Sequence, residues 1–225
     1  MPRTPSRPAR IDGRALFTGG RATARLLPST DWRWRVGGDW HPLHPKQLAP
    51  LPHRTRLVAG DDVLVLPEHL LAACLLLDLD GVAIDAPQGE VPIGDGSAGP
   101  FVRALQAAGV HGPRRSRLSV RVTWRGRTAT WRSGEHGVAW ARTFIEARAA
   151  RPGLFPGATP GCSLVLDDGG RVLAGRGRGL GDERAAHKLL DVLGDLAPRR
   201  ALGPLRGHVE AVEPSHLTNP HLEAA

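Results

Sequence analysis

The sequence contains very little cysteine and lysine. Cys74 and Cys162 are the only cysteines among 225 residues, and their positions fit neither a disulfide framework nor a zinc ribbon. We expect two buried, reduced thiols, as in a cytoplasmic protein. Nearly all of the 30 basic residues are arginine, because Lys46 and Lys188 are the only lysines. These arginines are scattered along a chain of net charge +8, so we expect no nucleic-acid partner.

Long apolar segments are also missing. Residues 1–10 are basic and proline-rich but lack the apolar stretch of a secretory signal, so we expect a disordered tail there. The longest apolar run, residues 70–79, is much too short to span a bilayer. We therefore expect a soluble cytoplasmic protein. Its basic surface would still suit an anionic nucleotide sugar or a transient contact with an anionic membrane.

The spacing of apolar residues predicts an α+β fold. Residues 21–27 alternate as a half-buried strand does, and residues 101–110 carry apolar side chains at helical spacing. Proline at position 67 suits the first turn of a helix, which we expect to run to about residue 79. Further strands are predicted over residues 62–66, 81–85, 118–124, 128–131, 163–166 and 171–173, and a helix over residues 183–196.

Strand and helix patterns recur in both halves of the chain. We predict an N-terminal α+β domain over residues 11–112 and a C-terminal α+β domain over residues 113–225. The glycine-rich stretch 175–181 lacks the Lys-Ser/Thr ending of a phosphate-binding P-loop. We interpret it as a connector.

Trp32, Trp34 and Trp40 lie close to arginines in the sequence. This pattern is compatible with a platform on which bases stack. The Gly-Gly-Asp turn at residues 37–39 favours a short hairpin with aromatic cross-strand pairs instead.

Polar residues interrupt two predicted helices. Glu68 and His69 begin an otherwise apolar helix, where their burial must be compensated. His187, Asp191 and Asp195 follow one another at intervals of four residues and form a stripe beside an apolar helix face. Taken alone, His69 fits a capping or core histidine, and His187 with Asp191 fits a helical ion pair. Together, these residues supply three ligands and neighbouring carboxylates, as in a catalytic zinc site.

Five motifs occur in the order of one known family. They are EHLLAA at residues 68–73, EVPIGDGSAGPFV at residues 90–102, ARTF at residues 141–144, HKLLDVLGDL at residues 187–196, and the late His216. The chain thereby resembles the zinc-dependent UDP-3-O-acyl-N-acetylglucosamine deacetylases of lipid A biosynthesis in Gram-negative bacteria. The turn at residues 13–20 is similar to the family's opening motif, except that Phe17 replaces a histidine. The resemblance implies two similar half-domains whose helices are sandwiched between their sheets, with the site at the junction.

The resemblance also implies a role for each candidate residue. His69, His187 and Asp191 would bind Zn²⁺, and Glu68 would act as the general base on the zinc-bound water. The other roles fall on residues in the later motifs: His216 as the second acid/base group, Asp195 as the carboxylate that keeps it charged, Thr143 as a donor to the tetrahedral intermediate, and Phe144 and Lys188 as the lining of the sugar and diphosphate region.

The chain is shorter than typical family members in three places. These lie around residues 41–60, between residues 110 and 142, and after His216. The shortening leaves the zinc chemistry in place but removes material that would hold the nucleotide and the acyl chain. We therefore expect a monomeric enzyme acting on an acylated nucleotide sugar. Two alternatives stay open: a zinc deacetylase of another acetylated amino sugar, or a non-catalytic basic binding protein for nucleic acid or an anionic lipid.

Overall fold

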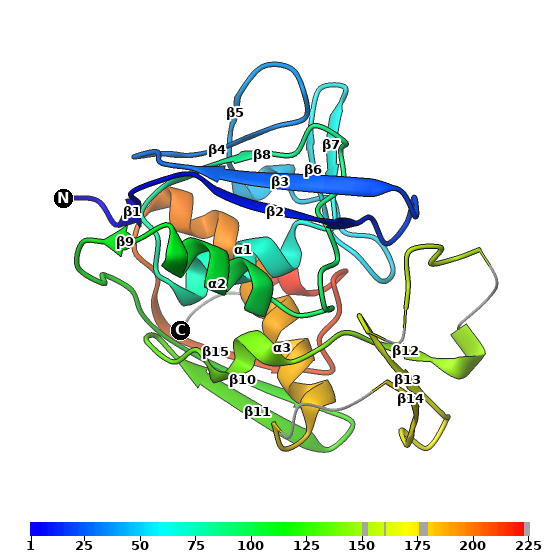
Figure 1. The fold of residues 1–225 in the computed structure, drawn as a ribbon. Helices are drawn as coiled ribbons and strands as arrows, with labels where there is room; N and C mark the ends of the chain where they lie inside the picture. The colour runs from blue at the N-terminus through cyan, green and yellow to red at the C-terminus, as the bar shows by residue number, and fades with distance from the viewer. Residues whose placement is uncertain (150–152, 160, 176–179, 223–225) are drawn as a thin grey trace.

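The fold has three layers, with the helices in the middle. The computed structural model describes residues 1–149, 153–159, 161–175 and 180–222, so part of the predicted connector at residues 175–181 lies outside the described residues. Figure 1 shows the helices lying between a five-stranded sheet and a three-stranded sheet. The predicted α+β architecture is confirmed. In the described part of the chain, no helix is long and apolar enough to cross a membrane.

The first layer is a five-stranded sheet. The burial of side chains alternates along its strand β3 (Arg21–Leu27) as predicted, with Ala22, Ala24 and Leu26 buried on one face. Neighbours are antiparallel except for β8 and β4, which run parallel. The strands, in sheet order, are β2 (Ala9–Arg14), β3 (Arg21–Leu27), β8 (Val82–Asp85), β4 (Trp32–Arg35) and β5 (His41–Pro42).

The tryptophan-rich hairpin is confirmed within this sheet. β4 and β5 pair antiparallel, and the side chains of Trp32 and Trp34 are buried in the core. The guanidinium groups of Arg33 and Arg35 lie 5.2 and 4.5 Å from the ring centre of Trp40. Because two of the three rings are buried, the segment does not form a base-stacking platform.

The opposite layer is a three-stranded sheet of the order β11-β10-β15. β10 (Arg117–Trp124) and β11 (Arg127–Arg132) form the predicted hairpin, and β15 (Arg206–Val212) runs parallel to β10. Arg125 and Gly126 connect the hairpin and both have positive φ, as the central residues of a type I′ turn do.

The remaining elements are short. They comprise the strands β1 (Thr4–Pro5) and β9 (Val110–His111), which pair with each other, the hairpin of β6 (Arg56–Ala59) and β7 (Asp62–Val65), the small sheet of β12 (Phe144–Glu146), β13 (Leu164–Leu166) and β14 (Val172–Ala174), and the 3-10 helices η1 (Pro45–Gln47), η2 (Gly137–Trp140), η3 (Ala147–Ala149), η4 (Ala197–Leu202) and η5 (Asn219–His221).

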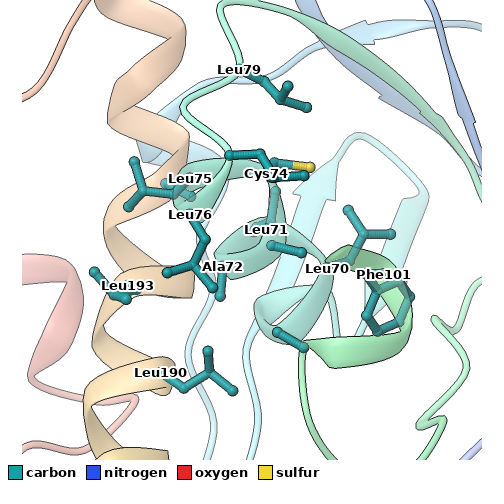
Figure 2. Close-up of a cluster of buried hydrophobic side chains, with 14 of the residues drawn as sticks. Leu70, Leu71, Ala72, Cys74, Leu75, Leu76, Leu79, Phe101, Leu190 and Leu193 are labelled. Carbon is teal, nitrogen blue, oxygen red and sulfur yellow. The ribbon is translucent and has the colours of Figure 1, made fainter. Parts of the chain in front are cut away.

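The helix α1 (Glu68–Leu76) is buried along its whole length. Figure 2 shows its leucines between Phe101 of α2 (Gly99–Ala107) and Leu190 and Leu193 of α3 (Glu183–Leu196). Burying each such side chain contributes about 1.5–3 kcal/mol. Side chains from both halves of the chain therefore form one hydrophobic core. The domain boundary at residues 112–113 stays a prediction.

Helices α1 and α3 approach each other closely at a glycine. A Cβ atom at Gly194 would lie 2.3 Å from the carbonyl oxygen of Glu68. A larger residue would therefore push the two helices apart at the first turn of α1.

The predicted disordered tail over residues 1–10 is wrong. β1 pairs with β9, and β2 begins at Ala9. The backbone amide of Arg3 donates to Oδ2 of Asp80 at 2.6 Å, and its guanidinium donates to the carbonyl oxygen of Leu77 at 2.6 Å. These partners are distant in sequence, and they compensate for the lack of local periodicity.

Candidate active site

A cavity of about 230 Å³ lies where the first turn of α1, the middle of α3 and β12 meet. One wall is apolar and includes Leu16, Leu66, Ile93 and Phe155. The other wall contains all but one of the residues that the sequence singles out: Glu68, His69, Thr143, Phe144, His187, Lys188, Asp191 and His216. The ninth, Asp195, is fully buried behind His216.

Three side chains form a candidate metal site. One ligand atom each from His69, His187 and Asp191 lie within 4.8 Å of one another, and all three residues are buried. Nε2 of His187 lies 3.2 Å from Oδ1 of Asp191, as residues four apart on a helix allow. Nδ1 of His187 lies 3.1 Å from the carbonyl oxygen of Ala141. Because a carbonyl oxygen only accepts, Nδ1 carries a proton, which leaves Nε2 as the ring nitrogen that would face a metal ion.

The charges of these three residues suit a divalent cation. Burial and the neighbouring His187 lower the pKa of His69 to about 3, so its imidazole is neutral. Burial would raise the pKa of Asp191, but Lys188 and His187 outweigh it and hold that pKa well below its usual range. Two imidazoles and one carboxylate are the donor set of many catalytic metal sites.

Two buried polar atoms at the site have no hydrogen-bond partner among the described residues. They are Nδ1 of His69 and Oε2 of Glu68. An unpaired buried polar atom costs about 1–3 kcal/mol. A metal ion coordinated by the three ligands, with a water molecule beside it, would give such atoms partners. The residues present therefore fit a metal site.

Glu68 is held at the entrance of α1. Leu66 has φ of 60°, which turns the chain into the helix, and Pro67 precedes the first helical residue. Adjacent helical residues point about 100° apart, so Glu68 and His69 face different parts of the cavity. Burial raises the pKa of Glu68 to about 8, an effect that the charge of His216 partly offsets. Oε1 of Glu68 lies 4.0 Å from Nε2 of His216.

His216 is paired with Asp195 on its far side. Nδ1 of His216 lies 2.9 Å from Oδ2 of Asp195, while Nε2 faces the cavity and lies 3.8 Å from Oδ2 of Asp191. Burial alone would lower the pKa of His216, but the carboxylates of Asp195 and Asp191 outweigh it and raise that pKa to about 9. His216 is therefore a cation at neutral pH.

Thr143, Phe144 and Lys188 are half-buried residues that line the cavity. The backbone amide of Thr143 donates to the carbonyl oxygen of Gly96 at 2.7 Å, which ties the ARTF segment to the glycine-rich loop. Nζ of Lys188 donates to Oδ2 of Asp191 at 2.9 Å and lies 5.5 Å from the ring centre of Phe144. All three residues therefore line the same cavity.

Sequence reasoning missed several residues that support the site. Thr55 and Asn219 both donate hydrogen bonds to Asp195, and the carbonyl of Ala141 orients His187. Arg142 and Glu183 form a buried ion pair that ties the ARTF segment to the start of α3. Asn219 could have been suspected because it follows His216 by three residues. Thr55 gives no local signal, since its partner is 140 positions away.

Known proteins are similar to this chain over most of its length. The family model LpxC, UDP-3-O-acyl N-acetylglycosamine deacetylase, matches residues 2–129 and 126–225. A UDP-3-O-acyl-N-acetylglucosamine deacetylase of Chlamydia caviae is 27% identical over 267 positions, covering 96% of this chain and 93% of the relative. One of Acidithiobacillus ferrooxidans is 30% identical over 227 positions, covering 81% of this chain and 73% of the relative.

The alignment also shows that the Chlamydia protein is longer than this chain. Its 267 positions exceed the 225 residues of the chain, so the relative contains segments without a counterpart here. The match nevertheless extends over both halves of the fold. The chain belongs to the LpxC family of UDP-3-O-acyl N-acetylglycosamine deacetylases.

Proposed function

We propose that the protein is a zinc-dependent N-deacetylase that removes the acetyl group from UDP-3-O-acyl-N-acetylglucosamine in lipid A biosynthesis. The observation that carries the proposal is the buried set of His69, His187 and Asp191 beside Glu68, whose carboxylate oxygen Oε2 has no hydrogen-bond partner among the residues that the structure describes. The names of the curated relatives give the substrate.

His69, His187 and Asp191 would hold the zinc ion. When bound, the ion would lower the pKa of a water molecule to about 7 and polarise the amide oxygen. The bond from His187 to the carbonyl of Ala141 fixes the ring so that Nε2 points to the ion. The ammonium group of Lys188 donates to Oδ2 of Asp191 and so restrains the second oxygen of that carboxylate.

Glu68 is the general base. Its carboxylate accepts a proton from water as the water oxygen bonds to the acetamide carbon. Burial raises the pKa of this carboxyl to about 8, which brings proton transfer to and from Glu68 close to neutral pH. Thr143 donates its hydroxyl hydrogen bond to the oxyanion that forms on the carbonyl oxygen.

His216 is the general acid. It is already protonated at neutral pH, and Nε2 faces the cavity within 4.0 Å of Glu68. The cation stabilises the oxyanion and then gives its proton to the amine as the carbon–nitrogen bond breaks. The products are acetate and the free amino sugar. Asp195 keeps the imidazole charged and oriented throughout.

Phe144 and Lys188 receive the nucleotide sugar. The ammonium group of Lys188 suits an anionic diphosphate, and the ring of Phe144 offers a flat surface for the sugar. We further propose that the enzyme acts in the cytoplasm as a monomer and touches the membrane transiently through its acylated substrate.

Mass spectrometry tests the proposal. The purified protein is incubated with UDP-3-O-acyl-N-acetylglucosamine, with UDP-N-acetylglucosamine and with another acetylated amino sugar, and loss of one acetyl group is followed. His187→Ala serves as the inactive control. We expect deacetylation of the acylated nucleotide sugar above all. Faster reaction of another amino sugar would make that sugar the assigned substrate. A zinc-loaded protein that is inactive on all three compounds would overturn the enzyme assignment.

A further inference from the structure

Thr55 lies behind the acid/base pair and does not line the cavity. It is a fully buried residue between the turn at residues 51–54 and β6, in the half of the chain that also carries Glu68. Its hydroxyl oxygen lies 2.6 Å from Oδ1 of Asp195 and 3.1 Å from Nδ1 of His216. A residue of the N-terminal half thus contacts both members of a pair in the C-terminal half.

The hydrogen atoms at this cluster can be assigned. A carboxylate only accepts, so the hydroxyl of Thr55 gives its one proton to Oδ1 of Asp195. Oδ2 of the same carboxylate accepts from Nδ1 of His216 and from Nδ2 of Asn219, each at 2.9 Å. The two oxygens of Asp195 are therefore fixed separately, one by Thr55 and the other by His216 and Asn219.

The orientation of Asp195 decides where His216 points. With Oδ1 held by Thr55, Oδ2 faces Nδ1, and Nε2 is left facing Glu68 at 4.0 Å and Asp191 at 3.8 Å. Without the hydroxyl, Oδ1 would be a buried carboxylate oxygen that lacks this donor. The carboxylate would then be free to rotate, and Oδ2 would no longer be held opposite Nδ1 of His216. The imidazole would then lose its fixed direction.

The backbone of Thr55 reaches the general base as well. Its carbonyl oxygen accepts a hydrogen bond from the amide of Leu66 at 3.1 Å. Leu66 adopts a positive φ two residues before Glu68 and so sets the entry of α1. One residue therefore touches the segment leading to Glu68 with its backbone and the support of His216 with its side chain.

We propose that Thr55 is a positioning residue that sets Glu68 and His216 against each other across the cavity. This inference rests on the proposed deacetylase function. The hydroxyl acts through Asp195, so it affects the chemical step and leaves binding of the nucleotide sugar unchanged.

Two substitutions separate the hydroxyl from the shape of the side chain. Thr55→Val keeps the volume and the branching but removes the donor, whereas Thr55→Ser keeps the donor. A hydrogen bond to a charged group is worth about 10- to 100-fold. We expect Thr55→Val to lower kcat by that factor with KM within about twofold of the wild type, and Thr55→Ser to restore most of kcat.

A matched control is available elsewhere in the chain. The hydroxyl of Thr23 donates to Oδ1 of Asp12 at 2.7 Å on an exposed strand pair away from the cavity. Thr23→Val removes a similar threonine–aspartate bond and should leave kcat and KM unchanged. Thermal unfolding of each variant identifies any that fail to fold, and Thr55→Ala then provides a second variant without the hydroxyl.

A double-mutant cycle tests whether Thr55 acts through Asp195. Thr55→Val should cost little further activity in an Asp195→Asn background, because the bond is already weakened there. Full additivity, or wild-type kcat in Thr55→Val, would overturn the inference while leaving the proposed function intact. A wild-type protein without deacetylase activity would overturn the proposed function and this inference with it.

Discussion

Oε1 of Glu68 and Nε2 of His216 face each other at 4.0 Å, although one residue begins α1 and the other lies near the C-terminus. Each changes the proton affinity of the other: the charge of His216 lowers the pKa of Glu68, and Glu68 helps raise that of His216. The proposed base and the proposed acid therefore share one cavity, with the three candidate metal ligands beside them.

Metal content should depend on the proposed ligands. We expect about one zinc ion per chain in the wild type and its loss in His187→Ala, because a three-ligand site cannot spare a donor. His208→Ala is the control, since His208 is bonded to Ser119 on the exposed sheet. Elemental analysis of dialysed protein measures both. Equal zinc in the two variants would remove His187 from the site.

Replacing the proposed base should separate catalysis from metal binding. Glu68→Gln keeps the shape of the side chain but cannot accept the proton. We expect zinc to be retained while kcat falls at least about 100-fold. Metal analysis and steady-state kinetics are made on the same preparation. Loss of zinc would instead make Glu68 a ligand.

Activity should follow a bell-shaped curve against pH, with limbs that belong to the coupled pair. The acid is lost as pH rises through the pKa of His216, which lies near 9 because Asp195 and Asp191 outweigh burial. Asp195→Asn removes one of these charges and lowers that pKa, so the basic limb should move to lower pH. His216→Gln should flatten this limb. An unchanged profile in both variants would exclude His216 as the acid.

How much of the fold the sequence predicts depends on how local the signal is. β3 alternates along its own length, and the polar stripe of α3 lies on one helix, so both are found where predicted. The prediction fails for the N-terminal strand β1, because its own residues show no alternation of apolar and polar side chains. It is held by β9 and by bonds from Arg3 to residues after α1.

The predicted helix ends are also misplaced, because contacts with distant parts of the chain and residues of positive φ end the helices. α1 stops at Leu76 and not near Leu79, since Asp78 takes a positive φ and accepts bonds from Ser116. α2 stops at Ala107 because Gly109, also at positive φ, turns the chain, and Val110 enters β9. Thr55 was missed for the same reason. Its hydroxyl interacts with Asp195, which is 140 positions away, so no local sequence spacing indicates the contact.

A buried ion pair should contribute strongly to stability. The side chain of Arg200 is 2% exposed, and Nε contacts Oδ1 of Asp78 at 3.1 Å. Arg200→Ala leaves that carboxylate without its cation, and we expect the free energy of unfolding to fall by about 3–5 kcal/mol. Arg10→Ala is the matched control, because Arg10 and Asp12 are paired at 2.7 Å but 61% and 56% exposed. Because this pair is exposed to solvent, Arg10→Ala should lower the free energy of unfolding far less than Arg200→Ala does.

Denaturant unfolding of the two variants makes the comparison. Equal losses would show that burial of the Arg200 pair adds nothing to its strength.

Dependence on acyl length should be weak. The chain lacks segments present in the longer Chlamydia relative. We expect the missing segments to include walls that would bind a long acyl chain. Each CH₂ group removed from the substrate should cost well under the roughly 0.8 kcal/mol expected for full burial. Values of kcat/KM across graded acyl lengths measure this. A steep fall with every shortened chain would show that a complete acyl passage persists.

The complete burial of α1 has a consequence for how the protein is made. During synthesis, α1 leaves the ribosome long before α3, yet Leu190 and Leu193 of α3 cover one of its sides (Figure 2). Until then the nascent chain presents a leucine-rich helix to water, which favours aggregation or capture by a chaperone. We expect the N-terminal half to reach its final form only after α3 has emerged, so that the candidate active site and the folded state arise in the same late step.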